Sequence, residues 1–220
     1  LIMLIMTSQW LIGLVYFFAA FLLIFGLWRM SSPVTAAGGI HVAGWGMAAA
    51  VIVSFLYAFS VSEAARPHLA VNVSLALGAL LLGGGAAWWS GRKAAMTAMP
   101  QMVAIYNGMG GGAAAAIAAM ELFGNRVFDL SALVGTLFGA LIGAISLSGS
   151  LIAWAKLDGR INKPLRMKGL QLINALLMLV TLCVGAWLMV VMQAAHGSLN
   201  DVLWLIGVFF GCALLFGVLM

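Results

Sequence analysis

Long apolar segments alternate with short polar connections along nearly the whole chain. Seven segments reach the length of about 20 residues that a helix needs to cross a bilayer. They comprise residues 9–28, 40–59, 69–89, 100–123, 130–155, 169–192 and 200–220. Prolines fall at or beside the connections, where a missing backbone N–H costs least, as Pro100 does at the start of the fourth segment. The pattern predicts an all-α, polytopic transmembrane helix bundle of about seven spans.

Composition excludes the soluble classes of protein. Of 220 residues, 65% are hydrophobic and only 7% are charged, whereas soluble domains average about 25% charged residues. A soluble globular domain, a disordered chain and a nucleic-acid binder are therefore excluded. Cys183 and Cys212 lie inside apolar segments and are expected to be reduced packing residues. No cluster of residues indicates a metal site.

The basic residues predict the orientation of the bundle. The connections after the first, third and fifth segments carry eight Lys or Arg residues, whereas the other connections carry only Arg66 and Arg126. By the positive-inside rule the first set is cytoplasmic, so the N-terminus lies outside. The chain begins at Leu1 and ends at Met220 without a basic anchor, and we expect it to be a fragment of a longer protein.

A few polar residues within the spans are candidates for chemistry. Asn107 lies about seven residues into the fourth segment, roughly 10 Å along the helix. Its amide either holds helices together or lines a hydrated path, because lipid offers it no partner. Ser146, Ser148 and Ser150 lie toward the cytoplasmic end of the fifth segment, with Ser146 and Ser150 on one face; for these serines, bonding back to the preceding turn is the alternative role. His41 could exchange protons near neutral pH or be a plain interfacial residue.

Small residues concentrate in the fourth and fifth segments. In the fifth segment, Gly135, Gly139 and Gly143 form a GxxxGxxxG stripe, which lets helices approach closely. In the fourth segment, Gly108 and Gly111 lack side chains and so make the helix narrower. We therefore expect these two helices to form a close-packed centre with the bulkier helices outside.

One short glycine pattern matches a nucleotide-binding motif. Gly108-x-Gly110-x-x-Ala113 matches the dinucleotide fingerprint, but it lies within a transmembrane segment and lacks the βαβ unit that the fingerprint requires. It is not interpreted as a cofactor site.

Two stretches resemble one family at the level of motifs. Residues 96–112 read MTAMPQMVAIYNGMGGG, and residues 139–150 read GALIGAISLSGS, followed by Lys156-Leu157 and Lys163-Pro164-Leu165. Both resemble the beta subunit of the proton-translocating NAD(P) transhydrogenase, and the resemblance covers the whole chain in span order.

The resemblance implies a function and a set of partners. The family transfers hydride between NAD(H) and NADP(H), coupled to proton passage across the bacterial cytoplasmic (inner) or mitochondrial inner membrane. Residues 1–220 would be the transmembrane proton-channel domain, with neither cofactor nor metal bound here and the NADP-binding domain absent from this chain. The implied partners are the alpha subunit, the NADP-binding domain of the beta subunit and a second alpha–beta unit in a dimer, all in a bacterial inner membrane.

The resemblance also implies a proton path. Many relatives have a histidine at position 107, where this chain has Asn107, whose amide does not titrate. The titrating group would then come from a missing helix, the alpha chain or, less directly, His41. Ser150 matches a family serine near the cytoplasmic end of the channel, and Gly108, Gly139 and Gly143 match small-residue positions. Two alternatives stay open: a secondary transporter or channel subunit with a glycine-rich central helix, and a purely structural membrane subunit.

Overall fold

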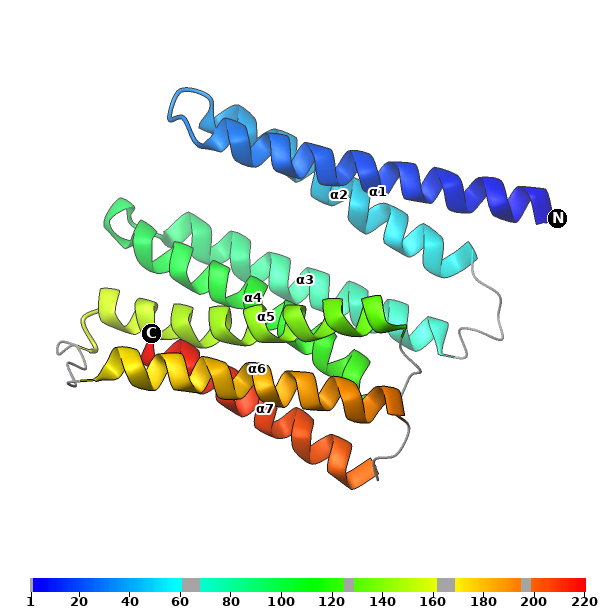
Figure 1. Cartoon of the computed structure of the whole chain (residues 1–220). Coiled ribbons are helices and arrows are strands. Elements are labelled where there is room, and N and C mark those ends of the chain that lie inside the picture. Colours follow the sequence, from blue (N-terminus) through cyan, green and yellow to red (C-terminus); the bar gives the residue numbers. More distant parts are fainter. Residues whose placement is uncertain (1, 61–67, 125–128, 162–168, 195–198) are drawn as a thin grey trace. The chain divides into compact units, whose positions relative to one another are not determined.

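The computed structural model describes residues 2–60, 68–124, 129–161, 169–194 and 199–220, and the regular structure in these ranges is helical (Figure 1). The helices are α1 (Ile2–Met30), α2 (Ala36–Ser60), α3 (Leu69–Lys93), η2 (Met96–Ala98), α4 (Met99–Phe123), α5 (Leu130–Leu157), α6 (Leu170–Ala194) and α7 (Leu199–Leu219). Among the described residues, seven helices are long and apolar enough to cross a membrane. The prediction of an all-α bundle of about seven membrane spans is confirmed.

Most helices are longer than the apolar segments that predicted them. α2 begins four residues before the predicted segment, and α3 continues four residues beyond it, to Lys93. Hydropathy marks the part of a helix that suits the bilayer, whereas backbone hydrogen bonding continues into the polar interface. α1 shows the largest difference, because the helix already begins at Ile2.

Local sequence accounts for several helix ends. Pro100 occupies the first turn of α4, where its missing N–H leaves no helical hydrogen bond unmade. α5 ends just before Gly159, which has a φ of 74°. This left-handed conformation strains any residue with a side chain, so glycine ends the helix here at little cost.

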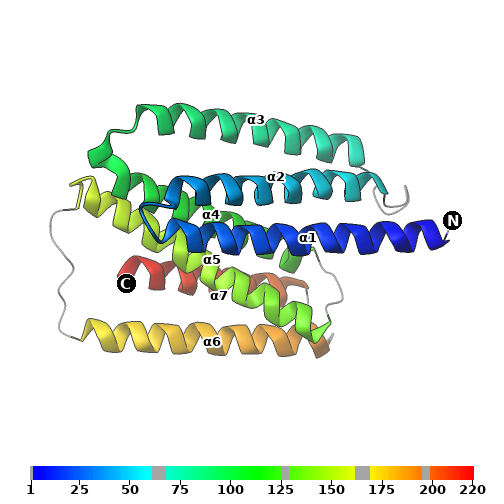
Figure 2. The ribbon, with the colours of Figure 1, turned by 90° about the horizontal axis from the view of Figure 1, so that it is seen from above.

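The chain divides into two compact units, Leu1–Gly91 and Arg92–Met220. In the first unit, α1 and α2 form an antiparallel hairpin (Figure 2). A Cβ atom added to Gly39 would lie 2.7 Å from the carbonyl oxygen of Gly26, so the two backbones touch where neither residue has a side chain. The hydroxyl groups of Tyr16 and Ser54 are 2.9 Å apart and link the same two helices. α3 buries none of its described residues.

The second unit is organised around α5. This helix packs against α4 and α7, and α6 packs against α7. Small residues of α4 and α5 and larger ones of α6 and α7 form one core, which comprises Ala115, Ala118, Leu122, Leu133, Leu137, Ala140, Leu141, Ala144, Leu188, Ile206, Phe209 and Ala213. The packing of α4 against α5 is the most extensive in this unit, as their small residues predict.

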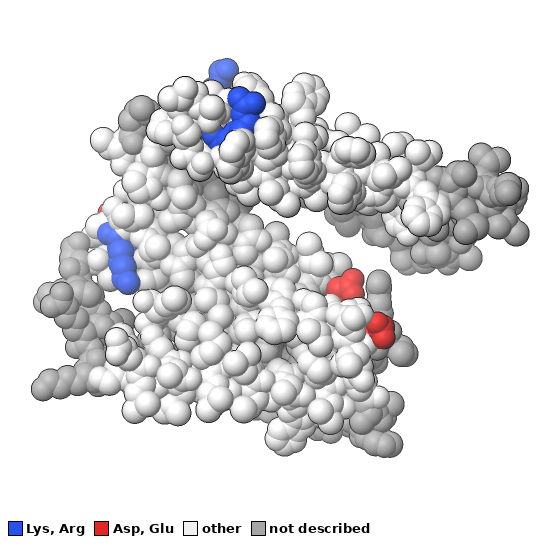
Figure 3. Space-filling model, turned by 45° about the horizontal axis from the view of Figure 1, so that its top comes forward, with Lys and Arg blue, Asp and Glu red and all other residues white. Residues whose placement is uncertain are grey.

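Charged side chains lie at the two ends of this unit rather than between them (Figure 3). Glu121 in the last turn of α4 and Asp129 at the start of α5 mark one end, whereas Lys156 and Arg160 mark the other. We call the second one the Lys156 end. Arg66, Arg126 and the basic residues of 162–168 lie outside the described residues, and the outside location of the N-terminus stays a prediction.

Candidate functional site

Asn107 connects α4 to α5 through a polar cluster. Its Nδ2 donates hydrogen bonds to Oγ of Ser150, at 2.9 Å, and to Oγ of Ser146, at 3.3 Å. The two serines are four residues apart on one face of α5, so a single amide group with two hydrogens reaches both. Asn107 stays exposed in this chain, whereas Ser150 is buried. The structure thus brings together two of the three residues that the sequence predicted for a proton path.

Glycines on α4 and α5 make this cluster possible. A Cβ atom on Gly108 would lie 2.9 Å from Cβ of Ser150, and one on Gly111 would lie 2.7 Å from Oγ of Ser146. A Cβ atom on Gly143 would lie 2.7 Å from the carbonyl oxygen of Gly111. Since ordinary van der Waals contact begins at 3.4 Å, a side chain at any of these three positions would force its neighbours to shift. Gly108, Gly111 and Gly143 therefore line the contact between α4 and α5.

Gly135 and Gly139, the other two members of the predicted glycine stripe, do not belong to this contact. A Cβ atom on either residue would meet nothing within 4 Å. In a helix with about 100° of rotation per residue, each step of four residues turns the position by about 40°. Gly135 is therefore about 80° away from Gly143 around α5. Leu133, Leu137, Ala140 and Leu141 are buried in this part of the helix instead.

α7 approaches the same stretch of α5 from another side. Ser148 is buried, and its hydroxyl donates to the carbonyl of Ala144 at 3.0 Å. For this serine, the alternative of bonding back to the preceding turn applies. A Cβ atom on Gly217 would collide with Oγ of Ser148, so α7 also needs a glycine here. The sequence analysis missed Gly217, because its fit depends on which face α7 turns to α5.

An open cavity of about 410 Å³ lies beside the serine pair. It extends from the pair toward the Lys156 end, and its lining comprises Ile145, Ser146, Gly149, Ser150, Ile152, Ala153, Lys156, Gly217 and Met220. Its volume is that of several water molecules, each of which takes about 30 Å³ in the liquid. The hydroxyl and ammonium groups in the wall supply the polar partners that such water needs. Lys156 was not predicted as a site residue, since a lysine at a helix end is normally solvated.

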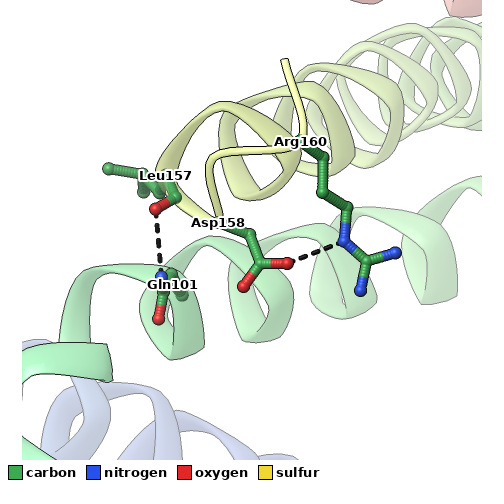
Figure 4. Close-up of polar contacts among 4 residues, drawn as sticks. All are labelled: Gln101, Leu157, Asp158 and Arg160. Atoms are coloured by element: carbon green, nitrogen blue, oxygen red, sulfur yellow. Dashed lines mark hydrogen bonds and ion pairs between the residues drawn. The ribbon is translucent and has the colours of Figure 1, made fainter. Parts of the chain in front are cut away.

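Further polar contacts link residues at the Lys156 end (Figure 4). Nε2 of Gln101, near the start of α4, donates to the carbonyl of Leu157 at 3.0 Å. Asp158 and Arg160 form an ion pair at 2.7 Å, and the guanidinium group of Arg160 lies 4.7 Å from the ring centre of Trp154. Asp158, the acidic residue nearest to Lys156 in sequence, is thus engaged elsewhere.

The third predicted path residue, His41, is an exposed residue of α2 in the first unit. Asn107 and Ser150 belong to the second unit, and the structure does not link His41 to them. Cys183 and Cys212 are free thiols. Within the described ranges, no group of three or more His, Cys, Asp or Glu residues could hold a metal ion.

Comparisons with known proteins identify the family of the chain. Residues 12–220 match the family model described as NAD(P) transhydrogenase beta subunit. NAD(P) transhydrogenase subunit beta from Rhodospirillum rubrum is 32% identical over 154 residues, and a second protein of the same name from a designated strain of that species gives the same figures. The match covers 66% of this chain and 31% of each relative, so this chain corresponds to about a third of their length. The chain belongs to the NAD(P) transhydrogenase beta subunit family.

Proposed function

We propose that this chain is the proton-translocating membrane portion of an NAD(P) transhydrogenase. In the complete enzyme, proton passage through these helices would be coupled to hydride transfer between NAD(H) and NADP(H). The nucleotide-binding domains would lie in other parts of the beta subunit and in an alpha subunit, within a dimer of alpha–beta units in a bacterial inner membrane. Family membership supports this reading over an unrelated transporter or channel.

The hydrogen-bonded cluster of Asn107, Ser146 and Ser150 is the observation that carries the proposal. With α4 beginning at Met99, Asn107 is eight residues or about 12 Å from the helix start. Ser150 is seven residues or about 10 Å from the end of α5 at Leu157. The cluster thus lies about a third of the way along α4 and a quarter of the way back from the end of α5, within the membrane-spanning part of both helices. A polar group at this depth is costly unless it serves packing or transport.

In this proposal the cluster orders a chain of hydrogen bonds rather than titrating. The amide of Asn107 donates to the two serine oxygens, so each serine hydroxyl can donate its own hydrogen onward. The cavity beside both serines gives water a place to receive that hydrogen. A proton arriving from a titrating group elsewhere in the enzyme would pass along this chain toward the Lys156 end.

Coupling to hydride transfer would require two states of the membrane helices that bind the proton differently. The glycine-lined contact of α4 and α5 supports such states, because backbones without intervening side chains can slide by small distances. A membrane potential of about 100 mV contributes about 2.3 kcal/mol per proton. This is enough to shift such an equilibrium by roughly 50-fold.

Asn107→Leu in the complete enzyme, reconstituted into vesicles, tests the proposal. We expect hydride transfer and proton uptake, measured together, to lose their coupling, with a fall in coupled rate of roughly fivefold for each hydrogen bond lost. Asn72→Leu is the matched control, because Asn72 is an exposed amide on α3. Full coupling in Asn107→Leu would refute a channel role for the cluster and leave it a packing role only.

A further inference from the structure

The cavity beside the serine pair is lined by a single charged side chain. Lys156 carries the one charged side chain among the residues that line it, and it is the second-last residue of α5, which ends at Leu157. Gly149, Ala153 and Lys156 are spaced by four and three residues, which places them on one face of α5. The lysine therefore belongs to the same helix face as the cavity wall rather than to the opposite surface.

Among the described residues, no acidic side chain neutralises the charge of Lys156. Asp158 pairs with Arg160, and Asp129 lies at the other end of α5. The helices packed against α5 carry few titratable groups, and none of those described lines the cavity; they are Tyr106 and Glu121 on α4, Cys183 on α6, and Asp201 and Cys212 on α7. Glu121 is in the last turn of α4 and Asp201 in the first turn of α7, both away from the Lys156 end.

Resting on the function proposed above, we propose that Lys156 is a positioning residue whose fixed positive charge lowers the proton affinity of the cavity and so promotes proton release at this end. Lys156 neither gives nor takes a proton in this role. The proton leaves the water held by the serine hydroxyls and passes to bulk water, and Lys156 acts on it only through the electrostatic field of its charge.

The distance from Ser150 sets the expected size of the effect. Lys156 follows Ser150 by six residues, which is about 9 Å along α5. A unit charge at that distance, at an effective dielectric constant near 20, shifts a proton equilibrium by about one pKa unit. Removing the charge raises the proton affinity of the cavity, so release then requires a higher pH. The pH of half-maximal proton passage should move upward by about one unit.

Lys156→Gln in the complete enzyme, reconstituted into vesicles with an entrapped pH dye, tests this inference. Proton passage would be measured against the pH on the side of the Lys156 end. We expect the profile of Lys156→Gln to shift upward by about one unit, and Lys156→Arg to keep the wild-type profile. Lys93→Gln removes one positive charge from the end of α3, a residue that does not line the cavity, and should leave the profile in place.

Three outcomes would overturn the inference: coincident profiles for Lys156→Gln and wild type, an equal shift in Lys93→Gln, or a shift in Lys156→Arg as large as in Lys156→Gln. The second outcome would indicate a general surface charge effect, and the third a structural role of the lysine. Asn107→Leu, measured in parallel, separates this failure from that of the proposed function. If Asn107→Leu loses coupling while Lys156→Gln changes nothing, the proton path stands and only the role of Lys156 falls.

Discussion

Replacing Gly143 with alanine should force apart the tightest point of the contact between α4 and α5. The new Cβ atom would lie 2.7 Å from two backbone atoms of α4, the nitrogen of Ala115 and the carbonyl oxygen of Gly111. Ordinary van der Waals contact begins at 3.4 Å, so each distance is 3.4 − 2.7 = 0.7 Å too short. Backbone atoms within a helix cannot turn aside as a flexible side chain can, so the helices themselves must separate.

Two consequences follow from a separation of this size. Overpacking of a well-packed contact typically costs about 1–3 kcal/mol. The hydrogen bond from Asn107 to Ser150, now 2.9 Å, would stretch to about 3.6 Å, at which length it no longer counts as a hydrogen bond. Gly143→Ala should therefore lower both the free energy of unfolding and the coupling of proton passage to hydride transfer.

Gly139→Ala is the matched control on the same helix, since its Cβ atom would meet nothing within 4 Å. Alanine in place of a helical glycine adds about 0.5–1 kcal/mol of stability at either position. Because both variants gain this stability, it cancels when they are compared. The free energy of unfolding of the Gly139→Ala variant should therefore exceed that of the Gly143→Ala variant by about 1–3 kcal/mol. Denaturant unfolding of the detergent-solubilised enzyme, followed by circular dichroism, measures the difference. Equal stability of the two variants would refute the close contact at Gly143.

Other contacts lead to smaller, separable effects. Tyr16→Phe removes the hydrogen bond to Ser54 and should lower the stability of the first unit by about 0.5–1.5 kcal/mol, without altering proton passage in reconstituted vesicles. Gln101→Leu should cost a similar amount in denaturant unfolding, because it removes the side-chain bond from α4 to the end of α5. The hydroxyl of Ser131 donates to the carboxylate of Asp129 and lowers the pKa of Asp129 below its ordinary value. The stability that this carboxylate contributes is present above its unfolded-state pKa and lost as pH falls through the folded-state pKa. Ser131→Ala should raise the pKa of Asp129, which a carboxyl NMR titration would detect.

The spans of the bundle were predictable from sequence because length and hydropathy decide them almost alone. The depth of the polar cluster along the helices could also be predicted from the sequence. Asn107 lies near the start of α4 and Ser150 near the end of α5, and antiparallel neighbours bring those two positions to similar depth. Whether the two side chains face each other depends on how each helix is rotated about its axis. Hydropathy gives weak information on that rotation in a membrane protein, because lipid-facing and buried residues are similarly apolar.

The position of Gly135 and Gly139 outside the α4–α5 contact depends on the same rotation. A spacing of four residues suggests a continuous stripe, but the stripe winds slowly around the helix and leaves the contact within two steps. The close approach of Gly217 to Ser148, and with it the wall of the cavity beside Lys156, depends on contact between segments about 70 residues apart in the sequence. No local sequence pattern predicts a contact between segments so far apart.

The hairpin of α1 and α2 bears on how the protein is made. Its contacts, from the touching backbones at Gly26 and Gly39 to the link of Tyr16 with Ser54, come only from the first 60 residues. Chains fold from the N-terminal side during synthesis at about 5–20 residues per second. The hairpin can therefore close in the membrane while the ribosome is still translating the segment that becomes α4. The α1–α2 hairpin would then enter assembly already folded, seconds before the helices of the polar cluster are complete.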